Sequence, residues 1–442
     1  MKKYIAILLL IPNILFAQND LSLLQAIEIG MWSNFDIQVS SRNQDINRVN
    51  NNWASAGALP TLNIGVKREE ALSDQSNNPA SFIQEKLRST SYNGNANVSW
   101  TLFNGFAIRA NKKKLDNLQK ISDNNASLTI ENTIQGIILQ YYNCILQKDR
   151  LELLQKVVNL SKNRLDYEQT KYDIGVTNKI DLLQIENAML TDSSNIILQE
   201  LNFKNAVKNL NLTIGRDINS RWNFIDKIDT TIQIFNYKEL ARNTLSDNTN
   251  IKNQYYNIQL SKQDIKLTLA PFYPIISINS GASFNESTYD IGNLSSTIDN
   301  TGENINYFAN FSINFRIFDG GKLYRNLRSV KIQKQIFELE LEKIKKEVLY
   351  QLSVNNDKYN SRINAYSLNQ KAFKIAEENF KLATEKKNRG VINSFMLRDI
   401  EIAYITSGIN AQQSAYNLME SKLSLLKISG NITRDFNMLK ND

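Results

Sequence analysis

The residue types that most often perform catalysis are scarce in this chain. It has no histidine and a single cysteine, Cys144, among 442 residues. These absences exclude Ser-His-Asp and Cys-His nucleophile systems, histidine-containing zinc sites and an intrachain disulfide. Carboxylates, lysines, tyrosines and serines remain, but none stands in a catalytic motif. We therefore expect a protein that is not an enzyme and that needs no cofactor or metal.

Charged residues do gather beside two turns. Asp181 follows a glycine-centred turn at 173–178, and Lys387 and Arg389 stand at the start of a second turn at 388–393. Ion pairing is the chemistry open to such residues if the two turns lie side by side. An exposed pair contributes only about 0–1 kcal/mol, so a symmetric set would be needed to bias a conformational equilibrium. The alternative is that Asp181 simply caps the helix that follows the turn.

Both turns belong to an internal duplication. Segments of the first half recur in the second half at a constant offset of 215 residues. The matching pairs are Trp100–Gly105 with Phe315–Gly320, Tyr172–Val176 with Lys387–Val391, Ile185–Glu186 with Ile400–Glu401, and Ile214–Gly215 with Ser429–Gly430. The expected organisation is repeat 1 at 18–215, a connecting segment at 216–236, repeat 2 at 237–430 and a C-terminal tail at 431–442.

Residues 1–17 have the features of a signal peptide. Lys2 and Lys3 precede an apolar run of about 13 residues, and a small-residue cleavage site ends at Ala17. The run is too short to cross a bilayer, and no later segment approaches eighteen apolar residues. We expect an exported protein that is either soluble or crosses a membrane as a β-barrel. The net charge of +8 would suit nucleic acid, but export argues against that partner.

Each repeat contains two stretches in which apolar and polar residues alternate strictly. The four expected strands lie at about 61–69, 91–103, 275–285 and 305–318, with polar loops at 70–90 and 287–304. Pro60 and Pro274 stop helical patterns and open these stretches. The strand lengths match the ~9–11 residues of a tilted membrane-spanning strand, and aromatic residues stand near the strand ends. This pattern favours a membrane barrel over a soluble sandwich.

Long helices account for most of the remaining chain. Residues 107–173 and 322–388 contain no proline, and shorter helical patterns follow at 178–213 and 393–428. Within the last of these, apolar residues from Ile402 to Leu426 recur at alternating steps of three and four, which is typical of a coiled coil. Two further helical patterns, at 21–58 and 237–270, precede the strands. Such rods have no compact core of their own, so the pattern predicts an oligomer.

The strand count also predicts an oligomer. Four strands cannot close a barrel, and open strand edges are forbidden in lipid. Two chains would supply eight strands with a filled interior, and three would supply twelve with room for a lumen. Geometry alone excludes the monomer and leaves both assemblies open.

The chain resembles the TolC-like outer membrane efflux protein family over essentially its whole mature length. The resemblance rests on the duplicated unit, the prolines before the first strand of each repeat, the strand exits Phe103-Asn104-Gly105 and Phe318-Asp319-Gly320, and the turn before Asp181-Leu182-Leu183. It implies a mainly α fold with a β-barrel contribution: a homotrimer with a 12-strand barrel in outer membrane lipid and a 12-helix periplasmic tunnel. It also implies passive export from a Gram-negative bacterium, with a periplasmic adaptor and an inner-membrane transporter as partners.

The resemblance further assigns roles to the two turns, which become the periplasmic tips. The adaptor is expected to dock on exposed residues around each glycine, which are Gly175, Val176, Thr177, Gly390, Val391 and Ile392. Asp181 matches an acid that holds the tunnel closed by pairing with a base of a neighbouring hairpin. The matching position of that base is Ile392, which cannot pair, so Lys387 or Arg389 is the expected substitute. Asp399 matches one of two acids that ring the entrance, and Met396 occupies the other position.

Two other classes of function fit the sequence less well. A structural or adhesive coiled-coil protein with a β anchor would carry its strands at one end of the chain, whereas here they occur in each repeat. An enzyme is disfavoured by the missing motifs. Small-molecule efflux and protein secretion through the same duct are not separated by the sequence.

Overall fold

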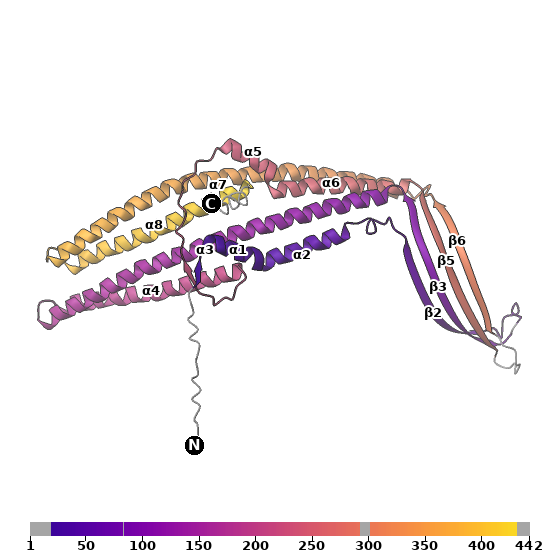
Figure 1. The fold of residues 1–442 in the computed structure, drawn as a ribbon, viewed down its shortest axis with the longest axis horizontal. Coiled ribbons are helices and arrows are strands. Elements are labelled where there is room, and N and C mark those ends of the chain that lie inside the picture. The colour runs from indigo at the N-terminus through magenta and orange to yellow at the C-terminus, as the bar shows by residue number, and fades with distance from the viewer. Residues whose placement is uncertain (1–18, 83, 292–300, 431–442) are drawn as a thin grey trace, which may run out of the picture. The chain divides into compact units, whose positions relative to one another are not determined.

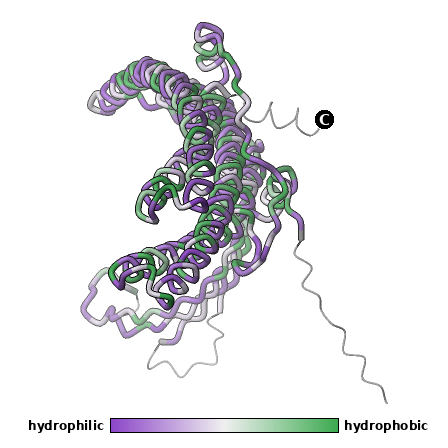
Figure 2. Tube along the Cα trace, turned by 90° about the vertical axis from the view of Figure 1, so that its left-hand side faces the viewer, coloured by the Kyte–Doolittle hydropathy of each residue, from purple (hydrophilic) through white to green (hydrophobic). Residues whose placement is uncertain are grey.

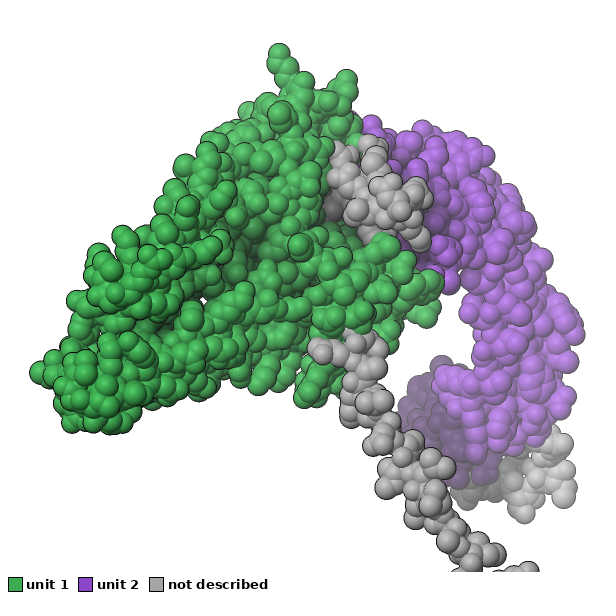
Figure 3. Space-filling view, turned by 60° about the vertical axis from the view of Figure 1, so that its left-hand side comes forward, with its two compact units in different colours: residues 1–42, 125–251, 344–442 green, residues 43–124, 252–343 purple. Residues whose placement is uncertain are grey.

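The computed structural model describes residues 19–82, 84–291 and 301–430. The expected signal peptide, the C-terminal tail and part of the loop at 287–304 lie outside these residues. The described chain divides into two compact units, coloured in Figure 3. Unit 1 contains residues up to 42, 125–251 and those from 344 onward, and unit 2 contains 43–124 and 252–343. The two longest helices pass through both units.

Helical hairpins dominate unit 1 (Figure 1). α3 spans Ala107–Asp173 and turns back into α4, Lys179–Thr213; α7 spans Lys322–Asn388 and turns back into α8, Ser394–Ile428. The long helices have the ranges expected from the missing prolines. No helix among the described residues is both long and apolar enough to cross a membrane, and Figure 2 shows hydrophilic and hydrophobic residues interspersed along the helices.

Contrary to expectation, the helical patterns at 21–58 and 237–270 are each broken once, and the first ends at Asn50, because residues 51–58 form bends and turns rather than helix. The first forms α1, Leu23–Ser33, and α2, Phe35–Asn50; the second forms α5, Tyr237–Asp247, and α6, Thr249–Leu269. An asparagine in extended conformation stands at each break, Asn34 and Asn248. Each accepts a hydrogen bond from a backbone N–H at the start of the next helix, so its side chain replaces the helical bond that the break removes.

The core of unit 1 surrounds a short sheet that the sequence analysis missed. β1, Asn19–Leu21, pairs in parallel with β4, Trp222–Phe224, which lies inside the expected connecting segment. The hydroxyl of buried Tyr141 in α3 lies 2.8 Å from the carbonyl oxygen of Leu21 and 2.7 Å from Oδ2 of Asp226, so these two acceptors share its single proton. Burial and the Asp226 carboxylate raise the pKa of this tyrosine, so the hydroxyl remains a donor. The connecting segment is therefore fixed against the start of repeat 1 and against α3.

Unit 2 holds the four long strands (Figure 1). They are β2, Thr61–Asp74; β3, Lys86–Asn104; β5, Ile275–Ile291; and β6, Thr301–Asn314. All neighbours are antiparallel, and the order is β2-β3-β5-β6, which leaves β2 and β6 as the edges. All four strands extend into the expected polar loops, because the backbone ladder continues into polar sequence. At its other end, β6 stops at Asn314 rather than 318, because its partner β5 begins opposite that residue.

The strand register gives the sheet one apolar and one polar face. Ile64 pairs with Ala96, Trp100 with Ile278, and Ile276 with Ile313, so apolar side chains lie opposite one another. The opposite face carries Asn and Ser, including hydrogen bonds between Ser277 and Ser312 and between Asn285 and Asn93. The alternation seen in the sequence is therefore shared by all four strands. A two-sided sheet of this kind can separate an apolar medium from a polar one.

Candidate functional site: the helical tips and the ion pairs behind them

Both tips are built by the same helix-ending motif. Gly175 and Gly390 have positive φ angles of 75° and 74°. The N–H of Val176 donates to the carbonyl of Lys171 at 2.8 Å, and the N–H of Val391 donates to that of Lys386 at 2.9 Å. These bonds, with those from the glycine N–H groups, are the Schellman pattern that ends a helix. Glycine is needed at each tip because of its backbone conformation.

The residues expected at the tips are largely exposed. Val176 and Val391 are each 67% exposed, the two glycines are exposed, and Thr177 and Ile392 are half-buried. The next helices begin with Asn178 and Asn393, whose side chains accept from the N–H of Asp181 and Met396. Each tip thus presents a small, partly apolar surface between two hydrogen-bonded caps, one that ends the first helix and one that begins the second.

Asp181 acts within its own turn in this chain. Asn178 Nδ2 donates to its Oδ2 at 3.0 Å, and the Thr177 hydroxyl approaches the same oxygen at 3.4 Å. These contacts match the capping alternative considered for this residue. Arg389 and Asp399 are exposed, and neither side chain has a hydrogen-bond or ion-pair partner among the described residues.

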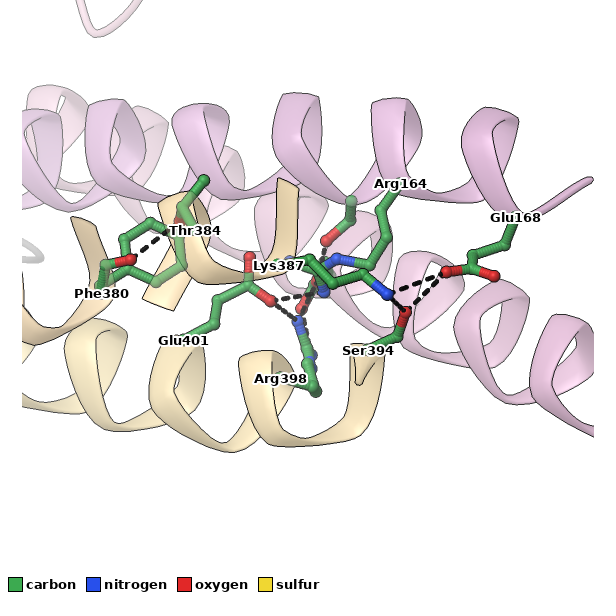
Figure 4. A network of polar contacts seen from close by, with 10 residues as sticks. Arg164, Glu168, Phe380, Thr384, Lys387, Ser394, Arg398 and Glu401 are labelled. Atoms are coloured by element: carbon green, nitrogen blue, oxygen red, sulfur yellow. Dashed lines mark hydrogen bonds and ion pairs between the residues drawn. The ribbon is translucent and has the colours of Figure 1, made fainter. Parts of the chain in front are cut away.

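The expected pairing of Lys387 with Asp181 is not formed within the chain. Lys387 Nζ instead lies 3.2 Å from Glu168 Oε1 and 2.6 Å from Ser394 Oγ, and Ser394 donates to the same glutamate oxygen at 2.7 Å. The reason is helical phase: Lys387 lies on the side of α7 that faces α3, where Glu168 is buried (Figure 4). Burial alone would raise the pKa of the Glu168 carboxyl, but the Ser394 and Lys387 hydrogen bonds lower it overall.

A second, more buried network lies next to this triad (Figure 4). Arg398 of α8 holds Asp192 of α4 by two parallel bonds of 2.7 Å, and Ser161 of α3 donates to the same carboxylate at 2.6 Å. Arg398 also reaches Glu401 at 3.0 Å, and Arg164 of α3 reaches that glutamate at 2.9 Å. The pairing with Asp192 outweighs burial and raises the pKa of Arg398.

Together these contacts join all four helices of the two hairpins. The second network contains two arginines and two carboxylates, so its formal charge is zero. The Asp192 and Glu401 side chains are 5% and 0% exposed, and those of Arg164 and Arg398 are 10% and 19% exposed. Removing one member of a buried pair leaves an uncompensated charge and costs about 3–5 kcal/mol. The network therefore clamps the α3–α4 hairpin to the α7–α8 hairpin.

Sequence reasoning missed this network, although one signal was present. Glu401 belongs to a repeated pair of residues, and its counterpart in repeat 1 is Glu186. Glu186 is exposed whereas Glu401 is fully buried, so the duplication placed the same residue in two environments. A glutamate directly before the apolar series that begins at Ile402 could have suggested a buried charge.

The buried side of α8 also differs from the expected one. Up to Ala415, α8 buries within this chain a series one residue earlier than the expected one, which includes Glu401, Gly408 and Ala411. Toward its C-terminus, Met419, Leu423 and Leu426 of the expected series are buried. The expected apolar series is only partly covered, and Ile402 is 47% exposed. Small side chains let α8 approach its neighbours closely: a Cβ at Gly408 would lie 2.9 Å from Leu153 and 3.0 Å from Phe373.

Comparison with solved structures identifies this fold as that of outer membrane channels. The Campylobacter jejuni CmeC outer membrane channel matches with a TM-score of 0.74 at 13% identity, over 94% of this chain and 88% of that one. The open state of the Neisseria gonorrhoeae MtrE outer membrane channel matches with a TM-score of 0.71 at 18% identity, over 93% and 89%. At these identities the likeness concerns the fold.

The sequence gives the family directly. A model of the outer membrane efflux protein family matches residues 32–216 and 240–431, once in each repeat. The chain therefore belongs to the outer membrane efflux protein family. A comparison with curated protein sequences gives no significant match.

The clamp can be tested with two neighbouring residues of α8. Arg398→Ala removes the cation that neutralises two buried carboxylates, and we expect it to destabilise the folded chain by about 3 kcal/mol. Asp399→Ala is the matched control, because Asp399 is exposed and has no partner among the described residues. Thermal unfolding followed by circular dichroism should show a clear loss for the first variant and almost none for the second. Equal melting temperatures would mean that the buried ion pairs do not hold the hairpins together.

Proposed function

We propose that three copies of this chain form a duct that passively conducts exported molecules from the periplasm through the outer membrane of a Gram-negative bacterium. The observation that carries the proposal is the four-stranded sheet with an apolar face and two open edges. Pairing β2 of one copy with β6 of the next would satisfy both edges, and three copies would close a 12-strand barrel wide enough for a lumen. The helical hairpins would extend the lumen as a periplasmic tunnel.

An exposed apolar series on α4 supports assembly through the helices as well. Ile180, Leu183, Leu190, Ile197 and Leu201 are between 48% and 67% exposed in the single chain. They recur at steps of three, four or seven residues, which is the spacing of a coiled-coil seam. The partly covered apolar series of α8 is a second such surface. We infer that neighbouring copies cover both.

The tips are proposed to carry the contacts with export partners. An adaptor would dock on Gly175, Val176 and Thr177 and on Gly390, Val391 and Ile392. The exposed valines and backbone groups there offer a small apolar contact that needs no charge. An inner-membrane transporter would supply the energy, since the duct is passive. Efflux of small molecules and secretion of proteins both remain compatible with this arrangement.

The gate is proposed to lie between copies rather than within one. Lys387 is engaged by Glu168, which leaves Arg389 as the exposed base, with Asp181 and Asp399 as acids. Three symmetric contacts of about 0–1 kcal/mol each would bias the entrance toward closure without locking it.

Assembly can be tested by placing a charge in the α4 seam. Leu190→Glu with Ile197→Glu should break the assembly, because six buried carboxylates would be forced together in a trimer. Asn195→Glu on the exposed polar side of the same helix is the control. Native mass measurement in mild detergent should give three chains for the parent and the control, and monomers for the double variant. A parent protein that is monomeric would refute the proposed duct.

The gate can be tested by its conductance in planar bilayers. Arg389→Gln and Asp181→Asn each remove one charge and preserve most of the hydrogen-bonding shape, so resting conductance should rise several-fold at low salt. The difference from the parent should shrink in 1 M salt, where screening acts within ~3 Å. Glu378→Gln, an exposed change far from the tip, is the control. If both gate variants conduct like the parent at low salt, the exposed charges do not close the entrance.

A further inference from the structure

A pocket of about 330 Å³ lies in unit 2 where β3 turns into α3 and where α6 leads into β5. The first of these corners is the strand exit Phe103-Asn104-Gly105. Two kinds of side chain meet in this pocket: the rings of Phe106 and Tyr273 on its wall, and the cations Arg109, Lys113 and Lys266. No acidic residue lines it.

The aromatic wall continues the apolar face of the sheet. A register shift between Thr101 and Phe103 places Phe103 opposite Ile276, and Ile276 lies on the apolar face. The Phe103 ring meets Phe106 edge-on at 5.2 Å, and Phe106 meets Tyr273 in the same way at 5.8 Å. Phe106 is 51% exposed. A molecule lying along the apolar face would therefore reach the pocket without crossing a polar barrier.

The backbone at this corner is held in an unusual conformation. Phe106 has a φ of +67°, and it is the one residue other than glycine with a positive φ in the described chain. A phenylalanine is strained there, and such strain persists only where the surroundings fix it. The backbone of Gly105 packs directly against Ala270, so closely that a Cβ on Gly105 would collide with the Ala270 carbonyl. This close packing holds the corner in place. The corner is thus built so that the Phe106 ring stands over the pocket.

The cations of the pocket differ from their neighbours in having no acidic partner. Lys112 pairs with Asp116, and Lys114 pairs with Asp264 at 2.7 Å. Among the described residues, Arg109, Lys113 and Lys266 have no carboxylate within ion-pair distance, and Arg109 lies 6.0 Å from the Phe106 ring centre. Three positive charges beside an apolar wall are complementary to an amphiphilic anion.

A buried polar group on the pocket wall gives an independent indication of a ligand. Gln263 is 7% exposed, and its Oε1 has no hydrogen-bond partner in the described structure. A buried acceptor without a donor is costly, so a bound group that donates a hydrogen bond here would be stabilised. A hydroxyl or ammonium of a bound headgroup would supply the missing donor.

Pairing at the sheet edges would leave this pocket uncovered. It lies at the ends of β3 and β5, the two central strands, so an edge strand separates it from a neighbouring copy on each side. Each intervening strand adds ~4.8 Å between the pocket and the neighbouring copy.

We propose that this pocket binds the headgroup of a membrane phospholipid, which rests on the membrane placement proposed above. The acyl chains lie along the apolar face of the sheet and the rings of Phe103, Phe106 and Tyr273. The phosphate lies among Arg109, Lys113 and Lys266, and the rest of the headgroup reaches Gln263. The bound headgroup thereby fixes how deeply the junction of β3 and α3 lies in the bilayer.

The experiment is a lipid titration of the delipidated protein followed by native mass spectrometry. The test variant combines Arg109→Gln, Lys113→Gln and Lys266→Gln, and the control combines Lys371→Gln, Lys374→Gln and Lys381→Gln, three exposed lysines of α7. Phosphatidylglycerol should bind the parent and the control equally and the test variant at least tenfold more weakly. Equal binding to all three would overturn the proposal.

Two further measurements distinguish a lipid from a small anion and keep the test valid if the triple variant does not assemble. Inorganic phosphate at the same concentrations should not displace the lipid; displacement would indicate a site for small anions and overturn the proposal. If the triple variant fails to assemble, Lys113→Gln alone should weaken lipid binding two- to threefold, and unchanged binding would overturn the proposal. A parent that assembles normally but binds no phosphatidylglycerol contradicts the lipid site only, whereas a parent that never enters a membrane contradicts the proposed function.

Discussion

The structure depends on one constraint, which is that backbone N–H and C=O groups must be hydrogen-bonded wherever water is absent. Each chain contributes four antiparallel strands, and within the described residues β2 and β6 each have a neighbour on one side only. In water these edges would be tolerable, but beside lipid they would be costly. Copies of the same chain can remove the edges completely. The pairing of strands between copies then sets the symmetry of the assembly, and the helices of each copy must pack within that same symmetry.

The distribution of charge divides the tip region into a fixed part and an adjustable part. Buried pairs such as Arg398 with Asp192 join the two hairpins of one chain, and breaking them would cost several times the energy of an exposed pair. Asp181, Arg389 and Asp399 remain at the surface, where each contact is weak. Rearrangement of the entrance should therefore occur between copies, while each pair of hairpins moves as one body. Lys387 belongs to the fixed part, because it contacts Glu168 and Ser394 within the chain.

Much of the fold could be predicted because it follows from local patterns. The missing prolines gave the bounds of α3 and α7, and alternation gave four two-faced strands in the right places. Local patterns could not reveal that Asn34 and Asn248 interrupt helices, because other asparagines of this chain lie inside unbroken helices. The strand ends depended on where a partner strand begins, as at Asn314, and that information is not local.

The candidate site was less predictable, because it depends on which side of each helix faces a neighbour. The tips were located from their glycines, whose role is fixed by backbone conformation alone. The partner of Lys387 depended on the packing of α7 against α3, which spacing within one helix does not specify. In the first half of α8 the buried residues, such as Glu401, Gly408 and Ala411, lie one position before the expected apolar series, because small and charged residues there face the same chain. Nearer the C-terminus, Met419 and Leu423 of the expected series are buried.

The central claim is that open strand edges of neighbouring copies pair with one another. It is tested most directly by disulfide cross-linking between β2 and β6. Asn63→Cys in β2 is combined in turn with cysteine at Asn304, Asn306, Asn310 or Ser312 of β6, all on the polar face. Burial raises the pKa of the native Cys144 thiol to about 12, so it should stay unreactive. The account predicts covalent dimers and trimers on a denaturing gel at one register. Oxidised protein that runs as a monomer at every register would contradict it.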